Sequence, residues 1–303
     1  MESRVPQEGV SAFGHPIIPL GKIARESRVA SYLQDSFLLQ FAKTGLDEGI
    51  IQRTITECLE AAKTTPSILA YERTAYSLLE KAGILPGFTR LTSDRAQTMA
   101  ETVRPYLKGK TILDLGCGPG KVSELLSRDG YEVSLADVYK NDYVTEKLSS
   151  LSFTLLEQDA PLPFPDASFD NVLVFAMLHH TTNPISLLRE IYRILKPSGR
   201  LHLIETVFGI EIQETKDPIA RKFASLSHEE QRQATMFLDY FGNHVTWYFT
   251  TELSHLVPVP FNFNTPTEWE KTFKELGYGT KEKKSLGIDP NSGVYHVFFS
   301  LEK

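Results

Sequence analysis

Apolar residues change their spacing along this 303-residue chain, and each spacing predicts a different kind of element. Between residues 26 and 107 they recur every three to four positions, which is typical of amphipathic helices. From 109 to 206, short apolar runs alternate with helical patterns, and this alternation predicts parallel strands joined by helices. From 207 to 264, aromatic residues crowd into a segment that interrupts the alternation.

The alternating segment and the end of the chain together predict seven strands. These strands are residues 111–115, 132–136, 153–157, 171–175, 200–205, 279–285 and 294–301. Gly130 and Gly199 are predicted to follow helix ends, since glycine tolerates the left-handed conformation that often terminates a helix. Asn-Pro at 183–184 predicts a helix start, and residues 265–268 form a capping box ahead of another helix.

These patterns predict an α/β domain with two additions. Residues 1–107 are expected to form an N-terminal helical region that serves as a lid or an interface. Residues 108–303 are expected to form the main domain, with a helical and aromatic lid inserted at about 207–264. The main domain is predicted to contain a doubly wound, Rossmann-like sheet, because alternating strands and helices place helices on both faces.

Composition and charge narrow the functional classes. The formal net charge is −6 and the isoelectric point is about 5.8, which disfavours a large nucleic-acid-binding face. The two cysteines, Cys58 and Cys117, are too few for a disulfide framework, and the sequence contains no C-x-x-C metal motif. We find no apolar signal core and no run of membrane-spanning length, so we expect a cytoplasmic protein without a membrane span.

The most informative segment is Ile-Leu-Asp-Leu-Gly-Cys-Gly-Pro-Gly at 112–120, where an apolar strand opens into a glycine-rich turn ahead of a helix. Gly116, Gly118 and Gly120 permit close approach of the backbone to a ligand, which the first amides of the helix then face. The spacing departs from the dinucleotide pattern G-x-G-x-x-G. Asp114 suits an ammonium group, which a methionine tail carries and a pyrophosphate lacks. The turn therefore favours S-adenosylmethionine, with a purely structural turn as the alternative.

Asp137 is expected at the end of the second predicted strand, 23 residues after Asp114 (137 − 114). An acidic side chain at about this distance accepts hydrogen bonds from the ribose hydroxyls of an adenosine. The alternative is a solvated carboxylate in the loop after the strand. Asp137 ends the strand that follows the glycine turn, and this position favours the ribose role.

A longer motif follows the third predicted strand: Glu-Gln-Asp-Ala-Pro-Leu-Pro-Phe-Pro-Asp-Ala-Ser-Phe-Asp at 157–170. With the glycine turn, this run resembles the class I S-adenosylmethionine-dependent methyltransferases, especially the type 11 branch that includes the ubiquinone and menaquinone methyltransferases. In that family, L-P-F-x-D-x-S-F-D is close to a signature. The resemblance implies that Asp159 hydrogen-bonds the adenine amino group and that the backbone of Ala160 lies beside it. The remaining candidates for cofactor contacts are Cys117, Val138 and Phe175.

This resemblance covers residues 111–206 and extends more loosely through the last two predicted strands. It does not cover residues 1–90 or the aromatic segment. It implies a seven-stranded sheet whose last strand is antiparallel to the others. It also implies that the ligand lies at the carboxyl ends of the strands, where all three motifs are expected.

His179 and His180 follow the fourth predicted strand, in a loop that faces the transferred methyl group in family members. A histidine there can take a proton from a hydroxyl or amine acceptor near neutral pH, and both are our catalytic candidates. The alternatives are a contact that only lines the substrate or cofactor site, and structural packing. Two adjacent histidines do not place two ligands on one helical face, so no metal site is expected.

The resemblance implies an enzyme (EC 2.1.1) that transfers a methyl group from S-adenosyl-L-methionine to a small molecule. The aromatic segment favours an apolar or aromatic acceptor, or an amine held by cation–π contacts, and its residues also suit an ordinary core. Its aromatic residues are Phe208, Phe223, Phe237, Tyr240, Phe241, Trp247, Tyr248, Phe249, Phe261 and Phe263.

Two alternative functions stay open at this point. One is an RNA methyltransferase of the tRNA wobble-uridine type, which the acidic charge disfavours. The other is a binding protein with this fold but no activity, which the intact set of cofactor residues disfavours. The sequence leaves open the acceptor, the methylated atom (oxygen, nitrogen or carbon) and the oligomeric state.

Overall fold

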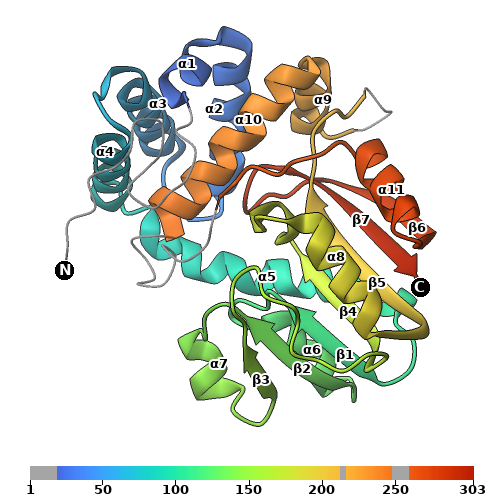
Figure 1. The fold of residues 1–303 in the computed structure, drawn as a ribbon. Coiled ribbons are helices and arrows are strands. Elements are labelled where there is room, and N and C mark those ends of the chain that lie inside the picture. Colours follow the sequence, from blue (N-terminus) through green and yellow to red (C-terminus); the bar gives the residue numbers. More distant parts are fainter. Residues whose placement is uncertain (1–18, 212–215, 248–258) are drawn as a thin grey trace, which may run out of the picture. The chain divides into compact units, whose positions relative to one another are not determined.

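The computed structural model describes residues 19–211, 216–247 and 259–303, except for the side chains of residues 86–93 and 247 (Figure 1). The chain divides into two compact units. One, here called the helical unit, comprises Met1–Leu91, Val207–Phe261 and Ile288–Tyr295. The other, here called the α/β unit, comprises Thr92–Thr206, Asn262–Gly287 and His296–Lys303.

The α/β unit is built on a seven-stranded sheet in the order β3-β2-β1-β4-β5-β7-β6 (Figure 1). Its strands are β1 (Thr111–Leu115), β2 (Glu132–Asp137), β3 (Ser152–Leu155), β4 (Phe169–Phe175), β5 (Leu195–Thr206), β6 (Gly279–Ile288) and β7 (Tyr295–Glu302). β1 pairs in parallel with β2 and β4, whereas β7 pairs antiparallel to β5. The predicted seven-stranded, Rossmann-like sheet with an antiparallel last strand is therefore confirmed.

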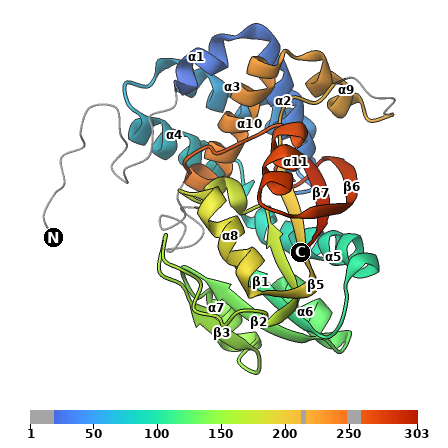
Figure 2. The same cartoon turned by 45° about the vertical axis from the view of Figure 1, so that its right-hand side comes forward.

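Alternation of side chains along the strands divides the apolar residues between two layers of helices. One layer contains α5 (Leu85–Val103) and α6 (Lys121–Arg128). The core on that side is formed by Ala100, Val103, Ile112, Leu126, Val133, Leu173, Ile204 and Phe298. On the opposite face, Phe299 packs against Phe273 of α11 (Pro266–Glu275) with ring centroids 5.3 Å apart. α8 (Pro184–Ile194) lies on the same face as α11 (Figures 1 and 2).

One predicted helix boundary was wrong. Gly199 does not follow a helix, because α8 ends at Ile194 and β5 begins at the next residue. The left-handed residue here is Ser198, with φ 60°, at the point in β5 where the pairing with β4 changes register. Gly199 meets a different requirement: a Cβ at its position would lie 2.9 Å from the carbonyl oxygen of Lys196, so a side chain does not fit. Gly130, in contrast, follows α6 with φ 89°, as predicted.

A short helix, α7 (Asp142–Lys147), escaped prediction because six residues are too few to show an apolar period. Its one local signal is the N-cap Asn141, whose side chain accepts the Tyr143 N–H at 2.9 Å. The predicted capping box of α11 is confirmed, with reciprocal hydrogen bonds between Thr265 and Glu268.

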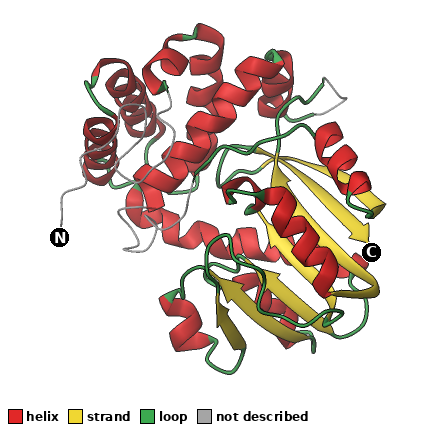
Figure 3. Ribbon diagram, viewed as in Figure 1, coloured by secondary structure: helices red, strands yellow, loops and turns green. Residues whose placement is uncertain are grey.

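The helical unit consists mainly of helices (Figure 3). They are α1 (Leu20–Arg25), α2 (Ser27–Ala42), α3 (Glu48–Thr64), α4 (Ile68–Lys81), α9 (Pro218–Ser225), α10 (His228–Phe241) and the π-helical turn η3 (Gly242–Trp247). Phe37 of α2 packs on Phe241 of α10, with ring centroids 4.6 Å apart. No helix among the described residues is long and apolar enough to cross a membrane.

Several aromatic side chains of the inserted segment form the core of this helical unit. Four of them are at most 2% exposed: Phe223, Phe237, Tyr240 and Phe241. Phe223, for example, packs on Tyr32 of α2 with ring centroids 5.2 Å apart. Tyr248 and Phe249 lie outside the described residues, as does the side chain of Trp247. The observed role of the four buried rings is packing.

The Leu-Pro-Phe run at 162–164 is clamped by charged residues of α8. The Arg193 guanidinium donates hydrogen bonds to the carbonyl oxygens of Leu162 and Phe164, at 2.9 and 2.8 Å. It also donates to Glu190 at 2.7 Å, and Glu190 accepts the Leu162 N–H at 3.0 Å. The hydrogen bond from Arg193 holds the pKa of Glu190 below its usual value. The clamp fixes the loop that leads into β4.

Asp170, the last residue of the signature, anchors the start of β1. Its carboxylate accepts the N–H groups of Lys110 and Thr111, both at 2.9 Å, and an ammonium hydrogen bond from Lys196 at 3.0 Å. Burial opposes ionisation, but these donors outweigh it and hold the pKa of Asp170 well below its ordinary value. Gly109 allows the close approach, since a Cβ there would lie 2.4 Å from Cγ of Asp170.

We expect Asp170→Asn to lower the free energy of unfolding by about 2 kcal/mol near neutral pH, because charge-assisted hydrogen bonds are lost. The pKa of Asp170 is lower in the folded than in the unfolded chain. Its stabilisation is therefore present above about pH 4 and is lost as the pH falls below that value. Denaturant unfolding at several pH values measures the effect. Asp166→Asn is the matched control, since the Asp166 side chain is 79% exposed. Identical pH profiles of unfolding for wild type and Asp170→Asn would contradict the anchoring role of Asp170.

Candidate functional site

The glycine turn and the end of β2 are joined by backbone hydrogen bonds at the carboxyl edge of the sheet. The Gly116 N–H donates to the carbonyl oxygen of Ala136 at 2.8 Å. The Gly118 N–H donates to Oδ2 of Asp137 at 2.8 Å. The structure therefore brings together the first two predicted motifs, because β1 and β2 are parallel neighbours whose carboxyl ends meet.

The three glycines of the turn all adopt positive φ but meet different surroundings. A Cβ on Gly116 (φ 74°) would lie 2.6 Å from Cγ of Met177, and one on Gly120 (φ 67°) would lie 2.7 Å from Leu148. A Cβ on Gly118 (φ 51°) would meet no atom within 4 Å among the described residues beyond its chain neighbours. Gly116 and Gly120 are thus required by packing, whereas a Cβ on Gly118 would face open space.

Asp114 is 4% exposed and lies in β1, just before the turn. The hydroxyl of Ser123, in the first turn of α6, donates to its Oδ2 at 2.6 Å. Burial raises the pKa of Asp114 to about 6; the hydrogen bond from Ser123 opposes this shift and the charge of Asp137 adds to it. A nearby cation would favour the ionised form of this carboxyl group.

Asp137 ends β2 and is 7% exposed. Its two carboxylate oxygens accept the N–H groups of Gly118 and Val138, at 2.8 and 2.7 Å. Burial raises its pKa, and the backbone donors oppose that shift. Each carboxylate oxygen has a second lone pair, so Asp137 retains the capacity to accept ligand hydroxyl groups.

The loop after β3 carries the third motif. Asp159 is exposed and adopts a left-handed backbone with φ 59°, and Ala160 is half-buried. The loop starts beside the second motif, since the Leu156 N–H donates to the carbonyl oxygen of Asp137 at 2.8 Å. Val138, also at this edge, is 36% exposed.

The other two cofactor candidates have packing contacts. Phe175, at the end of β4, is partly buried and packs against the core beneath α6. Cys117 is 9% exposed, is a free thiol and packs with Leu135 and Val144.

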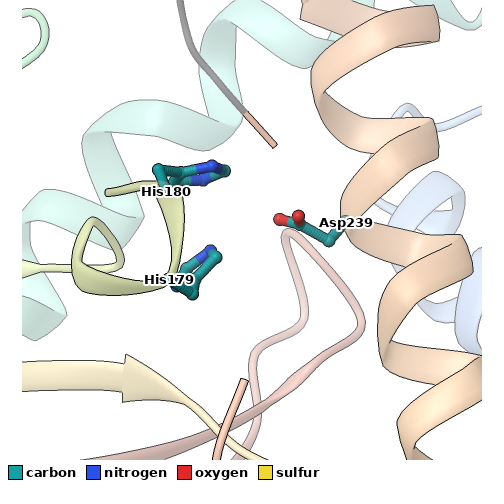
Figure 4. A group of neighbouring side chains, drawn as sticks. All are labelled: His179, His180 and Asp239. Atoms are coloured by element: carbon teal, nitrogen blue, oxygen red, sulfur yellow. The ribbon is translucent and has the colours of Figure 1, made fainter. Parts of the chain in front are cut away.

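The histidine pair occupies a single helical turn, η2 (Leu178–His180), after β4. Figure 4 shows the two rings projecting toward the same side of the turn; the Asp239 labelled there belongs to α10 of the helical unit. The rings lie 4.1 Å apart between centroids. Nδ1 of His179 hydrogen-bonds the carboxylate of Glu205. His179 is 2% exposed, whereas His180 is half-buried.

Sequence reasoning missed two residues of this site, Glu205 and Ser123. Glu205 ends an apolar stretch of β5 and is 1% exposed. Asp137 was identified because it is an acidic residue at the end of an apolar strand. Glu205 has the same pattern and could have been predicted in the same way. Ser123 gave no such signal, because serine in the first turn of a helix is common.

Comparison with known proteins agrees with this arrangement. Residues 113–203 match a family model described as a methyltransferase domain. That region is similar to methyltransferase domains and contains β1 to β4 and most of β5. The curated relatives that match this chain include ubiquinone and menaquinone methyltransferases.

Two of these relatives indicate the extent of the similarity. The "Ubiquinone/menaquinone biosynthesis C-methyltransferase UbiE" of Pasteurella multocida is 39% identical over 111 residues, which are 32% of this chain and 40% of the relative. The "Ubiquinone biosynthesis O-methyltransferase" of Pseudomonas paraeruginosa is 31% identical over 109 residues, 33% of this chain and 46% of the relative. The chain thus spans less than half the length of these relatives. A solved methyltransferase from Methanosarcina mazei has a TM-score of 0.48 at 18% identity, covering 67% of this chain and 96% of its own.

Gly118→Ala provides a test of the open side of the turn. An L-residue at positive φ costs about 1–2 kcal/mol of stability, and the new methyl group projects into the space assigned to the cofactor. We expect a loss of affinity for S-adenosylhomocysteine of about tenfold or more, equivalent to 1.4 kcal/mol, measured by calorimetry. Gly130→Ala is the matched control, because Gly130 also has positive φ (89°) and open space but lies at the opposite edge of the sheet. Equal affinity in the two variants would place the ligand elsewhere.

Proposed function

We propose that this protein transfers a methyl group from S-adenosylmethionine to a small-molecule acceptor. The main support for the proposal is the contact between the carboxyl ends of β1 and β2. There the Gly118 N–H donates a hydrogen bond to Asp137, and a Cβ on Gly118 would face open space. The matched methyltransferase domain and relatives that act as O- and C-methyltransferases support the same reading. The acidic net charge of −6 favours a small acceptor over a nucleic acid.

In this proposal, the residues at the edge of the sheet bind and orient the cofactor. The glycine turn accommodates the amino-acid tail, Asp114 faces its ammonium group, and Asp137 accepts the ribose hydroxyls. Asp159 and Ala160 bind the adenine. When bound, the cofactor supplies an activated methyl group on a sulfonium, so the protein's task is mainly to position the acceptor and to exclude water.

The acceptor side of the proposed site includes the histidine turn. The His179 ring contacts two other rings, those of His180 and Phe263, with centroid distances of 4.1 and 5.1 Å. Phe263 comes from the aromatic segment, and the neighbouring Asn262 donates to the carbonyl oxygen of Thr181 at 2.7 Å. We propose that Phe263 is an aromatic wall of the acceptor pocket. The lid role of residues 1–107 and 207–264 stays a prediction.

Binding of S-adenosylhomocysteine to wild type and Asp137→Ala tests the cofactor site. We expect the variant to lose affinity by about tenfold or more, because a buried acceptor of ribose hydrogen bonds is removed. Calorimetry measures the affinity, and circular dichroism confirms folding. Asp142→Ala is the control, since Asp142 is an exposed carboxylate on the next helix. Failure of folded wild type to bind S-adenosylhomocysteine would overturn the proposed function.

The affinity for S-adenosylhomocysteine is also expected to depend on pH. The Asp114 carboxyl is charged only above its pKa of about 6, so its attraction for the cofactor ammonium is lost as the pH falls through that value. Below it, affinity is expected to fall by up to about tenfold per pH unit. Calorimetry from about pH 5 to pH 8 measures the profile. Ser123→Ala is expected to move the midpoint upward, because it removes a donor to the carboxylate; a flat profile in wild type would contradict the ammonium role.

A further inference from the structure

A methionine side chain from the turn after β4 lies against the glycine turn after β1. A Cβ on Gly116 would lie 2.6 Å from Cγ, 3.0 Å from Cε and 3.2 Å from Cβ of Met177. Three atoms of one partly buried side chain therefore contact the Gly116 backbone. The two residues are 61 positions apart (177 − 116), so this contact depends on the pairing of β1 with β4.

The contact lies beyond the last described pair of β1 and β4, which is Asp114 with Leu173. On their outer sides the same strands stay paired for longer, β1 with β2 as far as Leu115 and β4 with β5 as far as Phe175. β1 and β4 are also the neighbours at which the strand order reverses. Ligands of open α/β sheets bind beyond the carboxyl ends of such strands, so Met177 is placed beside the proposed cofactor site.

The backbone on both sides of Met177 is fixed to β5. Ala176 has φ 49°, a left-handed conformation that is uncommon for residues other than glycine. Its N–H donates to the carbonyl oxygen of Ile204 at 2.6 Å. After Met177, the Leu178 N–H donates to Oε2 of Glu205 at 3.0 Å. A left-handed residue of this kind persists only where its surroundings enforce it, and such residues cluster at functional sites.

Hydrogen bonds hold the other side of the glycine turn. The Gly116 N–H donates to the carbonyl oxygen of Ala136 at 2.8 Å, and the Gly118 N–H donates to Asp137 at 2.8 Å. Both acceptors belong to β2, the neighbour of β1 on the side away from β4. The turn is thus fixed by polar contacts on the β2 side and by the apolar contact with Met177 on the β4 side.

Another methionine of the α/β unit shows ordinary packing. Met99 of α5 is also partly buried, and it packs against the apolar core that includes Leu126 of α6. Met177 contacts the backbone of a turn instead, at a glycine that has no side chain to meet it. An unbranched, flexible side chain such as methionine suits this task, because it adapts to irregular spaces.

We propose that Met177 is a positioning residue for the cofactor. Its side chain holds Gly116 in its left-handed conformation and thereby places the Gly118 N–H against Asp137 at the cofactor site. This inference rests on the proposed function, because the glycine turn is the proposed site. Without the methionine side chain the turn is packed on one side only, so we expect the turn to shift and the affinity for the cofactor to fall while the fold persists.

The first test is the affinity for S-adenosylhomocysteine of the full chain, measured by calorimetry. We expect Met177→Ala to lose affinity by about tenfold or more. Met177→Leu keeps most of the volume and is expected to stay within about threefold of wild type. Met99→Ala is the matched control, because it removes an equally flexible side chain from the same unit, and its affinity is expected to stay within about twofold of wild type. Circular dichroism confirms that each variant is folded.

The second test measures the contact by a double-mutant cycle, which does not depend on cofactor binding. Gly116→Ala brings a methyl group onto the Met177 side chain, so we expect it to lower the denaturant midpoint of unfolding less in the Met177→Ala background than in wild type. The strain of positive φ is the same in both backgrounds and cancels. Gly120→Ala is the control, since its Cβ would meet Leu148 and not Met177; its shift is expected to be equal in both backgrounds.

The third test uses wild type, so it does not depend on any variant being stable enough to bind. The chain has four methionines, and their methyl groups are labelled with ¹³C for NMR. The Met177 signal is assigned by its loss in Met177→Leu. We expect saturating S-adenosylhomocysteine to shift this signal and to leave that of Met99 unchanged.

The outcomes separate this inference from the proposed function. Absence of S-adenosylhomocysteine binding in folded wild type would remove the proposed function itself. Normal binding by wild type together with equal affinity in Met177→Ala, or with a Met177 methyl signal that the ligand does not move, would overturn the positioning role alone. Equal shifts of Gly116→Ala in the two backgrounds would show that Met177 does not hold the turn.

Discussion

The parallel pairing of β1 with β2 and β4 is the constraint on which the rest of the site depends. Parallel neighbours end at the same edge of the sheet, so each turn that follows a strand emerges beside the others. The Gly116 N–H donates to Ala136, and the Met177 side chain fills the space that a Cβ on Gly116 would need. The turns after β1, β2 and β4, which are about 20 to 60 residues apart in the chain, therefore meet at one edge of the sheet.

Three buried carboxylates lie on strands whose carboxyl ends form this edge: Asp114, Asp137 and Glu205. A buried carboxylate is costly unless donors satisfy it. Here the donors come from the neighbouring turns: the Ser123 hydroxyl, the Gly118 N–H and the Leu178 N–H. The same bonds that make burial tolerable also set the conformation of the turns. Stability and the geometry of the site are therefore coupled at each of the three positions.

The region shared with known methyltransferases is only part of the chain. It covers residues 113–203, whereas the helical unit and the last two strands lie outside it. The aromatic segment illustrates the difference: four of its rings fill the core of the helical unit, and Phe263 stacks on His179 in the α/β unit. Aromatic residues that are close in the sequence thus have two different roles, core packing in the helical unit and stacking on His179.

The sequence by itself determined the order of the strands along the chain, the glycine turn, and the positions of Asp114, Asp137 and the histidine pair. These features are local. The spacing of apolar residues, the residues of a turn and the residue type at a strand end can each be recognised within a short segment of sequence. Only the tertiary structure decided the rest, because it depends on partners distant in the chain. The pairing of His179 with Glu205 spans 26 residues, and the anchoring of β1 by Asp170 spans 59. The left-handed backbone of Ser198 and the close approach of the Lys196 carbonyl oxygen to Gly199 were likewise seen only in the structure.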